Sequence, residues 1–379
     1  MKKIVALICT VLLLISCSKK SNELVVTVEN SSDFDRVDEL VEIALDSIRS
    51  KVTLTDTLSY IVLDNEGKEI PSQVTYDRKL IFQSGLKAKE TKEFKITTGI
   101  PEQYASKTYG RFIKERKDDF AWENDRVAFR IYGEALIASD GPSNGIDAWY
   151  KRTPNLIIDK WYQNDLSGTA SYHEDHGEGL DDYKVGRSLG AGAMAPYVND
   201  KLWLNENFVN EEVLENGPLR TSFKLTYKDI NVDGKSYAES RTISIDAGSQ
   251  LSKIIQAYTI KEPMQVAAGI VKREKSDSII STDKYIVYAE PKSAKVDDVY
   301  LALVFPNGIE KTVIDTYNVQ TNSYSHVLGI TTQQPKIPVT YYSGYGWSKY
   351  GFADLASFEK YVKDFSKALA TPFSIKYSK

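Results

Sequence analysis

The strongest constraint on the fold is a strict alternation of apolar and polar residues in the middle of the chain. From Thr221 to Lys228, every second residue is aromatic or aliphatic. A period of two sends successive side chains to opposite faces of a strand, so this segment predicts a half-buried antiparallel strand. Asp233-Gly234 then supplies a turn, and the segment from Tyr237 to Ile245 alternates again, which predicts a hairpin.

Similar strand patterns continue towards the C-terminus, at 251–260, 285–289 and 299–305. Together these segments predict a large double-sheet domain over residues 107–379. Near its end, Asp354 is placed to cap a short helix whose apolar residues recur every three or four positions and stop before Pro372. We expect this helix to pack against a sheet.

A smaller unit precedes this domain. Between residues 24 and 100, short apolar segments alternate with turn sequences such as Asp64-Asn65-Glu66-Gly67, which predicts a small β-sandwich. Residues 101–106 have the composition of a linker. The expected class is therefore all-β, with a small N-terminal β-sandwich, a large antiparallel double sheet and a short C-terminal helix.

The N-terminus has the pattern of an exported lipoprotein. Two lysines precede an apolar run that ends in Ser16-Cys17, and the run is shorter than the ~20 residues of a membrane-spanning helix. We expect residues 1–16 to be a signal peptide, Cys17 to carry lipid, and residues 17–23 to form a tether. Because no aspartate follows Cys17 and no acidic cluster follows the tether, we expect an outer-membrane lipoprotein that faces the periplasm.

Composition narrows the class of protein further. The formal charge is −4 with a sequence pI of about 5.7, and no basic stripe is present, which argues against nucleic-acid binding. The only other cysteine, Cys9, lies in the signal, so we expect neither disulfides nor thiolate chemistry in the mature chain. The chain has 24 tyrosines, 13 phenylalanines and 5 tryptophans, which is typical of β-rich extracytoplasmic proteins that bind glycans.

The segment Glu115–Arg126 interrupts the strand pattern with a high density of charged and aromatic residues. We take five of its residues as candidate substrate-binding groups: Arg116, Asp118, Asp119, Trp122 and Asp125. An arginine can hold a sugar carboxylate in a two-pronged ion pair. The alternative is a salt-bridged loop at a domain junction.

A second segment, Tyr172–Gly192, contains five glycines and two of the three histidines, and it predicts a long shaped loop. Histidine exchanges protons near neutral pH, so His173 and His176 are candidate general acids or bases, with Tyr183 as a second proton donor. Further candidate substrate-binding groups in this segment are Glu178, Asp182 and Arg187. The alternatives are histidines that only bond the backbone, or a weak calcium site on the carboxylates; no cofactor is expected.

Two further expectations concern the shape of the site. Trp347 lies among glycines and tyrosines, so we expect it to be partly exposed as a sugar-stacking subsite. We also expect the segments Glu115–Arg126 and Tyr172–Gly192 to meet in one cleft of the larger domain, because their charges would be costly to bury without partners.

Long motifs in this chain resemble a family of Gram-negative glycan degraders, the domain-of-unknown-function family 4861. The matching stretches are YGRFIKERKDDFAWENDRVAFRIYG from Tyr109, GIDAWYKRTPNLIIDKWY from Gly145, YHEDHGEGLDDYKVGRSLGAGA from Tyr172, NGPLRTSFKLTY from Asn216 and GWSKYGF from Gly346. The resemblance implies a galactose-mutarotase-like supersandwich and an association with pectin-type degradation. After Ser188, where the resemblance leads us to expect a second arginine and a GCG-like turn, this chain has Leu189 and Ala191. A carboxylate clamp must therefore rely on Arg187 or Arg116.

The function that we expect is action on uronate-containing oligosaccharides, with a lyase or related proton-transfer enzyme favoured. One alternative is a non-catalytic glycan-binding lipoprotein, and another is a mutarotase-like sugar epimerase. The expected partners are an oligosaccharide and, through the lipid anchor, a membrane. The sequence does not identify a protein partner.

Overall fold

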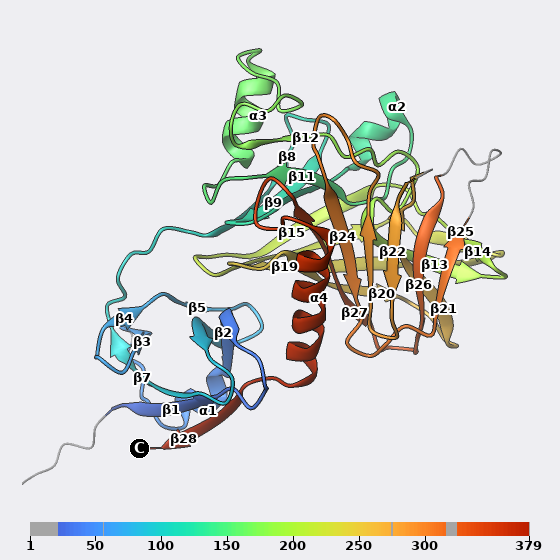
Figure 1. Cartoon of the computed structure of the whole chain (residues 1–379). Coiled ribbons are helices and arrows are strands. Elements are labelled where there is room, and N and C mark those ends of the chain that lie inside the picture. Colours follow the sequence, from blue (N-terminus) through green and yellow to red (C-terminus); the bar gives the residue numbers. More distant parts are fainter. Residues whose placement is uncertain (1–21, 56, 274–275, 316–323, 379) are drawn as a thin grey trace, which may run out of the picture.

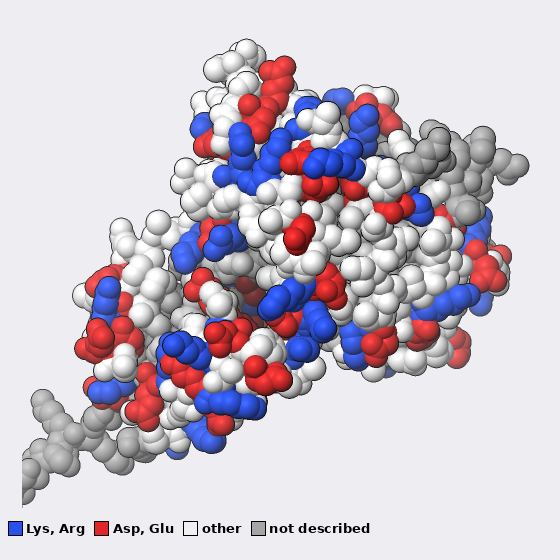
Figure 2. All heavy atoms as spheres, in the orientation of Figure 1, with Lys and Arg blue, Asp and Glu red and all other residues white. Residues whose placement is uncertain are grey.

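The computed structural model describes residues 22–55, 57–273, 276–315 and 324–378, and it confirms the all-β class (Figure 1). The signal, Cys17 and most of the tether lie outside the described residues. Within the described ranges, no helix combines the length and the apolar character needed to cross a membrane. Figure 2 shows acidic and basic side chains intermixed on one face of the molecule.

The N-terminal unit consists of two small antiparallel sheets around one core. The five-stranded sheet has the order β28 (Ser374–Ser378), β1 (Leu24–Glu29), β7 (Thr91–Gly99), β3 (Ser59–Leu63), β4 (Glu69–Ile70). The three-stranded sheet has the order β2 (Arg36–Ala44), β6 (Lys79–Leu86), β5 (Ser72–Val74), and the short helix α1 (Leu45–Arg49) follows β2. Alternate residues of β1 are buried, as a half-buried strand requires.

The last strand returns to this unit rather than staying in the larger one. β28 pairs antiparallel with β1 along its whole length. From the sequence we expected residues 107–379 to form the large domain. The pairing of β28 with β1 shows that residues 374–378 belong to the small unit instead. The pairing follows from β1, whose backbone would otherwise be an open sheet edge on that side.

The large unit is built on an eight-stranded antiparallel sheet. Its order is β15 (Phe208–Asn216), β16 (Arg220–Tyr227), β19 (Glu239–Asp246), β20 (Leu251–Tyr258), β27 (Val339–Trp347), β24 (Val299–Val304), β23 (Tyr285–Ala289), β22 (Ser278–Ser281). The expected hairpin is present as the β16–β19 pair. Its Asp233-Gly234 turn closes a small extra hairpin between them, β17 (Ile230–Val232) and β18 (Lys235–Tyr237).

Two five-stranded sheets face this layer and share one apolar core with it. The first has the order β14 (Lys201–Leu202), β13 (Ala191–Val198), β21 (Met264–Val271), β26 (His326–Gln333), β25 (Lys311–Asp315). The second has the order β12 (Gly179–Asp181), β11 (Asp147–Lys151), β10 (Ala128–Ile131), β9 (Asp119–Asn124), β8 (Thr108–Ile113). The expected double sheet is therefore present.

Helices cover the outer faces of these layers. The C-terminal helix α4 (Leu355–Ala370) buries Phe358 and Val362 against the eight-stranded sheet, and Asp354 caps it as expected. The helix α3 (Ile158–Leu166) covers the outer face of the β8–β12 sheet (Figure 1). A 3₁₀ turn, η1 (Glu134–Leu136), and the short helix α2 (Ile137–Asp140) follow β10.

Buried polar bonds join the two units. Arg220 of β16 bonds Glu42 of the small unit at 2.6 Å and Asp246 of its own sheet at 2.5 Å. Gln73 of the small unit accepts from the backbone amides of Leu219 and Arg220 at 3.0 and 2.9 Å. The small unit is therefore docked on one end of the eight-stranded sheet by directional bonds.

Candidate active site

The site is built on the outer face of the β8–β12 sheet. Along β9, Phe120 and Trp122 point into the main core, so Asp119, Ala121 and Glu123 point outward beneath α3. The same alternation directs Arg130 of β10, Asp147 and Lys151 of β11, and Asp181 of β12 to this outer face. Helix α3 and the loop at Tyr172 bury these charges.

Arg130 collects three carboxylates at one end of this face. Its guanidinium donates to Asp147 Oδ2 at 2.6 Å and to Asp181 Oδ2 at 2.8 Å, and it lies 3.9 Å from Asp119 Oδ2. Across the strands, Arg130 stands directly opposite Asp147. The rings of Tyr132, Trp149 and Tyr172 lie within 5.1 to 5.6 Å of the guanidinium, so they enclose its charge. We call Asp119, Asp147 and Asp181 the acidic cluster.

Burial changes the proton affinities in this cluster. Burial raises the pKa of Asp119 to about 6, against the opposing pull of Arg130 and Arg116. Burial, together with repulsion from Asp181, raises the pKa of Asp147 to about 7. Burial also raises the pKa of Asp181 and holds the pKa of the Tyr132 hydroxyl well above its usual range. Carboxyl groups with such pKa values can exchange protons near neutral pH.

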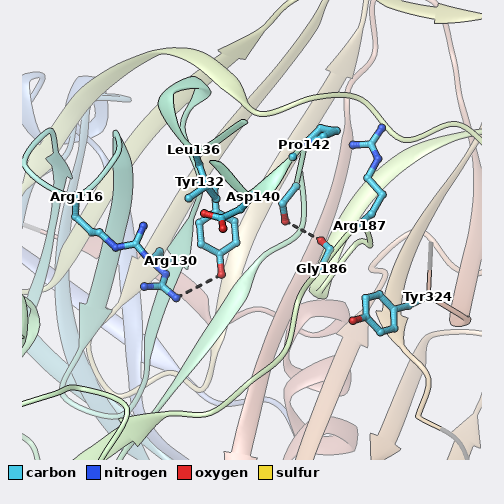
Figure 3. Close-up of a pocket in the computed structure, with 11 residues that line it drawn as sticks. Arg116, Arg130, Tyr132, Leu136, Asp140, Pro142, Gly186, Arg187 and Tyr324 are labelled. Carbon is cyan, nitrogen blue, oxygen red and sulfur yellow. Dashed lines mark hydrogen bonds between the residues drawn. The ribbon is translucent and has the colours of Figure 1, made fainter. Parts of the chain in front are cut away.

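A cavity of about 670 Å³ opens beside this cluster (Figure 3). Its lining includes Arg116, Arg130 and Tyr132 on one side and Arg187 and Tyr324 on the other. Leu136, Asp140, Gly141, Pro142, Ser143 and Gly186 complete the lining. Three arginines and one carboxylate make the wall basic, and the volume lies in the range of ligand pockets.

Arg116 has spare hydrogen-bonding capacity in this wall. Its Nη1 is buried and has no hydrogen-bond partner among the described residues, and its closest carboxylate is Asp119 at 3.8 Å. Arg187 is more committed, because its two terminal nitrogens donate to the backbone carbonyls of Asn205 and Leu204 at 2.5 and 2.8 Å. Arg116 is therefore the arginine best placed to receive an anion.

The two segments singled out from the sequence do meet here. Asp119, of the first segment, and Asp181, of the second, both pair with Arg130, and the ring of Tyr172 lies 5.6 Å from the same guanidinium. The first segment is not the loop that we expected, because Asp119–Asn124 forms β9, a fully buried strand. The second is mostly loop, as expected, but includes the short strand β12.

The histidines lie outside the lining of the large cavity. His173 is half exposed, with its Nδ1 3.1 Å from the Asp181 carbonyl oxygen and 3.5 Å from Asp181 Oδ2. The Nε2 atom of His176 lies 3.2 Å from the Ser171 carbonyl, and the residue lines a separate small cavity of about 50 Å³. Tyr183 is buried beneath Arg273, and its hydroxyl has no hydrogen-bond partner among the described residues. Tyr183 is not among the residues that line the cavity.

Both tryptophans that we expected at the substrate are in the core, so these expectations were wrong. Trp122 is fully buried and donates to Ser252 Oγ at 3.0 Å. Trp347 is also buried and donates to the Val296 carbonyl. Strand alternation explains both cases, because each residue falls on the inner face of its strand.

The remaining candidates make local contacts away from the cavity lining. Asp125 accepts from the Gly248 amide at 2.7 Å, Glu178 pairs with Lys160 at 2.8 Å, and Asp182 pairs with Lys295 at 2.7 Å. Asp118 sits in the turn before β9 with a positive φ of 62°. In the part of the chain that the structure describes, no group of three or more His, Cys, Asp or Glu side chains is arranged to hold a metal ion.

Three residues that form the site were missed from the sequence: Arg130, Tyr132 and Asp147. Asp181 belongs only to the weak calcium alternative among our expectations. The available signal was the alternation itself. In AFRI (β10) and DAWYK (β11), the charged residues lie on a sheet face where the neighbouring strands also place charged residues. A charged residue in an otherwise apolar strand points to a buried pair across the sheet.

Comparisons with known proteins identify the family. A family model described as domain of unknown function (DUF4861) matches residues 28–375. The chain belongs to this family. It is also 30% identical over 384 residues to the uncharacterized protein P7 of Formosa agariphila, with 95% of each chain covered. The resemblance to this family that we inferred from the sequence motifs is thereby confirmed.

Two solved structures share the fold of this DUF4861 protein. A glycosyl hydrolase family 38 protein from Enterococcus faecalis has a TM-score of 0.51 at 9% identity, covering 94% of this chain and 48% of its own. An alpha-mannosidase from Enterococcus faecalis has a TM-score of 0.50, also at 9% identity, covering 94% of this chain and 46% of its own. The chain spans about half the length of these structures, and the likeness concerns the fold alone.

Proposed function

We propose that the protein is a carbohydrate-active enzyme that binds a uronate-containing oligosaccharide in the arginine-lined cavity. The observation that carries the proposal is Arg116, which lines the basic wall of a 670 Å³ cavity and has no carboxylate closer than Asp119, 3.8 Å from its buried Nη1. A sugar carboxylate offers two acceptor oxygens to such a guanidinium. Arg187 and Ser143 lie in the same lining and supply further polar contacts.

The reaction that we favour is a lyase-type elimination, with Asp140 and Tyr132 as the proton-transfer groups. Such a reaction removes a proton from the carbon beside the carboxylate, so the developing negative charge must be neutralised. Arg116 supplies the neutralising positive charge at the cavity wall. Asp140, the carboxylate in the cavity lining, accepts the proton from this carbon, and Tyr132 donates its own proton to the glycosidic oxygen as the carbon–oxygen bond breaks. The Tyr132 hydroxyl lies 3.4 Å from Arg130, and its pKa, held well above the usual range, keeps the proton on the oxygen for this donation. This assignment moves the proton-transfer roles from the histidines to Asp140 and Tyr132.

The test is incubation of the purified protein with oligogalacturonides and with a neutral oligosaccharide of equal length. A lyase produces shortened products with a new carbon–carbon double bond that absorbs in the ultraviolet. Tyr132→Phe should remove turnover and leave binding within a few-fold, whereas Arg116→Gln should weaken binding of the acidic ligand alone. Equal binding of the neutral and acidic ligands would contradict the proposal.

The second candidate is a non-catalytic glycan-binding protein. It is favoured by the acidic cluster, whose three carboxylates are buried behind Arg130 and do not line the cavity. In that case the wild-type protein binds the acidic ligand without any product forming, and Tyr132→Phe changes only the affinity. A third candidate, a sugar epimerase, would interconvert anomers without shortening the chain.

We propose further that Cys17 is lipidated and anchors the protein to the outer membrane. The support is the lipobox sequence and the lysine-containing tether that follows it. Cys17→Ser should release the protein from the membrane fraction of the producing cells. Retention of that variant in the membrane fraction would contradict the proposal.

A further inference from the structure

The acidic cluster carries more negative charge than its arginines compensate. With all three aspartates ionised, Asp119, Asp147 and Asp181 hold three negative charges against the two positive charges of Arg130 and Arg116. All three side chains are at most 3% exposed. Asp119 Oδ1 and Asp147 Oδ1 also have no hydrogen-bond partner among the described residues. An unpaired buried charge is costly, so this arrangement favours a proton on the cluster.

The other groups that face the cluster do not supply the missing charge. Tyr162 of α3 donates to Asp119 Oδ2 at 3.1 Å, and Trp149 of β11 donates to Asp147 Oδ2 at 3.2 Å; both donors are neutral. The hydroxyls of Tyr132 and Tyr172 contact Arg130. Asp182, next to Asp181, adds negative charge, although Lys295 pairs with it. His173 is half exposed at the edge of the cluster, with its Nδ1 3.5 Å from Asp181 Oδ2.

Arg116 links this excess charge to the cavity. Its guanidinium lies 3.8 Å from Asp119 Oδ2 and also lines the cavity wall, beside Arg130 (Figure 3). An anion bound at Arg116 would compete with Asp119 for the same positive charge. Asp119 would then lose part of the positive charge that offsets its own negative charge. Protonation of the acidic cluster would restore the charge balance.

We propose that binding of an acidic sugar at Arg116 is coupled to the uptake of a proton by the acidic cluster. The proposal rests on the proposed function and adds its regulation: the cavity binds its anionic ligand more tightly as the pH falls from 8 towards 6. The raised pKa values of Asp119 and Asp147, about 6 and about 7, place the exchange in this range. For one proton, the affinity rises at most about tenfold per pH unit.

The experiment is isothermal titration calorimetry of the full protein with trigalacturonate at pH 7, in buffers of different ionisation enthalpy. The dependence of the measured heat on the buffer gives the number of protons exchanged. We expect net uptake of up to one proton by the wild type. Asp119→Asn should reduce the uptake, and Arg116→Gln, at the cavity wall, should remove both the tight binding and the uptake. Asp46→Asn, on the small unit, is the matched control and should behave as the wild type.

The outcomes separate the two proposals. Tight binding of trigalacturonate without proton uptake, and with an affinity that is constant from pH 6 to pH 8, would overturn the coupling and leave the proposed function intact. Absence of binding would overturn the proposed function and the coupling together. If Asp119→Asn does not fold, Asp147→Asn and Arg116→Gln carry the same comparison, and unchanged uptake in both would count against the acidic cluster.

Discussion

The sharpest stability prediction concerns the buried ion pair at the other end of β9. Glu123 and Lys151 are both fully buried, and Lys151 Nζ lies 2.6 Å from Glu123 Oε2 and 2.6 Å from the Asn124 carbonyl. The second oxygen, Oε1, accepts from the amides of Ile157 and Ile158 at 2.7 and 2.8 Å, where α3 begins. Glu123 thus joins two strands to the helix that covers the site.

Glu123→Gln keeps the shape of the side chain but removes its charge. The ammonium of Lys151 then remains buried without a counterion, and breaking such a pair costs about 3–5 kcal/mol of unfolding free energy. Lys151→Met should cost less, because the two backbone amides still stabilise the carboxylate. The double variant should be destabilised by less than the two single effects together, with a coupling of about 1–3 kcal/mol.

The assay is urea unfolding followed by tryptophan fluorescence, since Trp149 of β11 stacks on Trp161 of α3 at 5.4 Å between ring centroids. The control is Asp46→Asn, which breaks a surface pair with Arg78 and should change stability by less than about 1 kcal/mol. Single variants that each lose less than about 1 kcal/mol, with additive effects, would refute the reasoning.

The pKa of Asp147 rises from its ordinary value of 3.8 to about 7 on folding. As the pH rises from 4 to 7, the wild type should therefore lose up to about 4 kcal/mol of unfolding free energy relative to Asp147→Asn. A difference between the two proteins that is constant with pH would contradict this. Gly179→Ala should destabilise strongly, because its Cβ would lie 1.9 Å from a carbonyl oxygen of β11; Gly177→Ala, with a similar positive φ and open space, is the control, and equal losses in thermal unfolding would count against the collision. Asp354→Ala removes the cap of α4, a 2.8 Å bond to the Ser357 amide, and should cost about 1 kcal/mol in urea unfolding, whereas Asp354→Asn should cost less.

Much of the fold was available from periodicity. The alternation over Thr221–Lys228 places β16 within a residue of its observed bounds, and Asp354 with its apolar repeat places α4. Both signals are local, because a strand face or a helix stripe is written in consecutive residues. The return of β28 to the small unit has no local signal. Its pairing with β1 joins residues more than 340 positions apart.

The site was only half predictable, for a related reason. Arg116, Asp119 and Arg187 stood out because they lie in segments dense with charge, and the structure places them in the cavity lining or in the acidic cluster. Arg130 and Asp147 each stand alone among apolar neighbours, so charge density did not reveal them. Their meaning depends on which strand lies opposite, and that is a long-range property of the sheet. The density of charge around Trp122 also led us to expect this residue at the substrate, although it is a core residue of β9.

The outer face of the β8–β12 sheet shows how a structural buried charge differs from a functional one. At one end, every polar atom of Glu123 and Lys151 has a partner, and together they tie α3 to β9 and β11. At the other end, one carboxylate oxygen each of Asp119 on β9 and Asp147 on β11 has no hydrogen-bond partner among the described residues. The same holds for Nη1 of Arg116, in the turn before β9, and Arg116 lines the cavity. The carboxylates at both ends are almost fully buried, so burial of the carboxylates alone does not separate the two ends. Folding stability favours a hydrogen-bond or ion-pair partner for every buried polar group. Buried groups without a partner persist where a ligand or a proton supplies it. On this face, therefore, incomplete pairing rather than charge marks the end at which we propose binding.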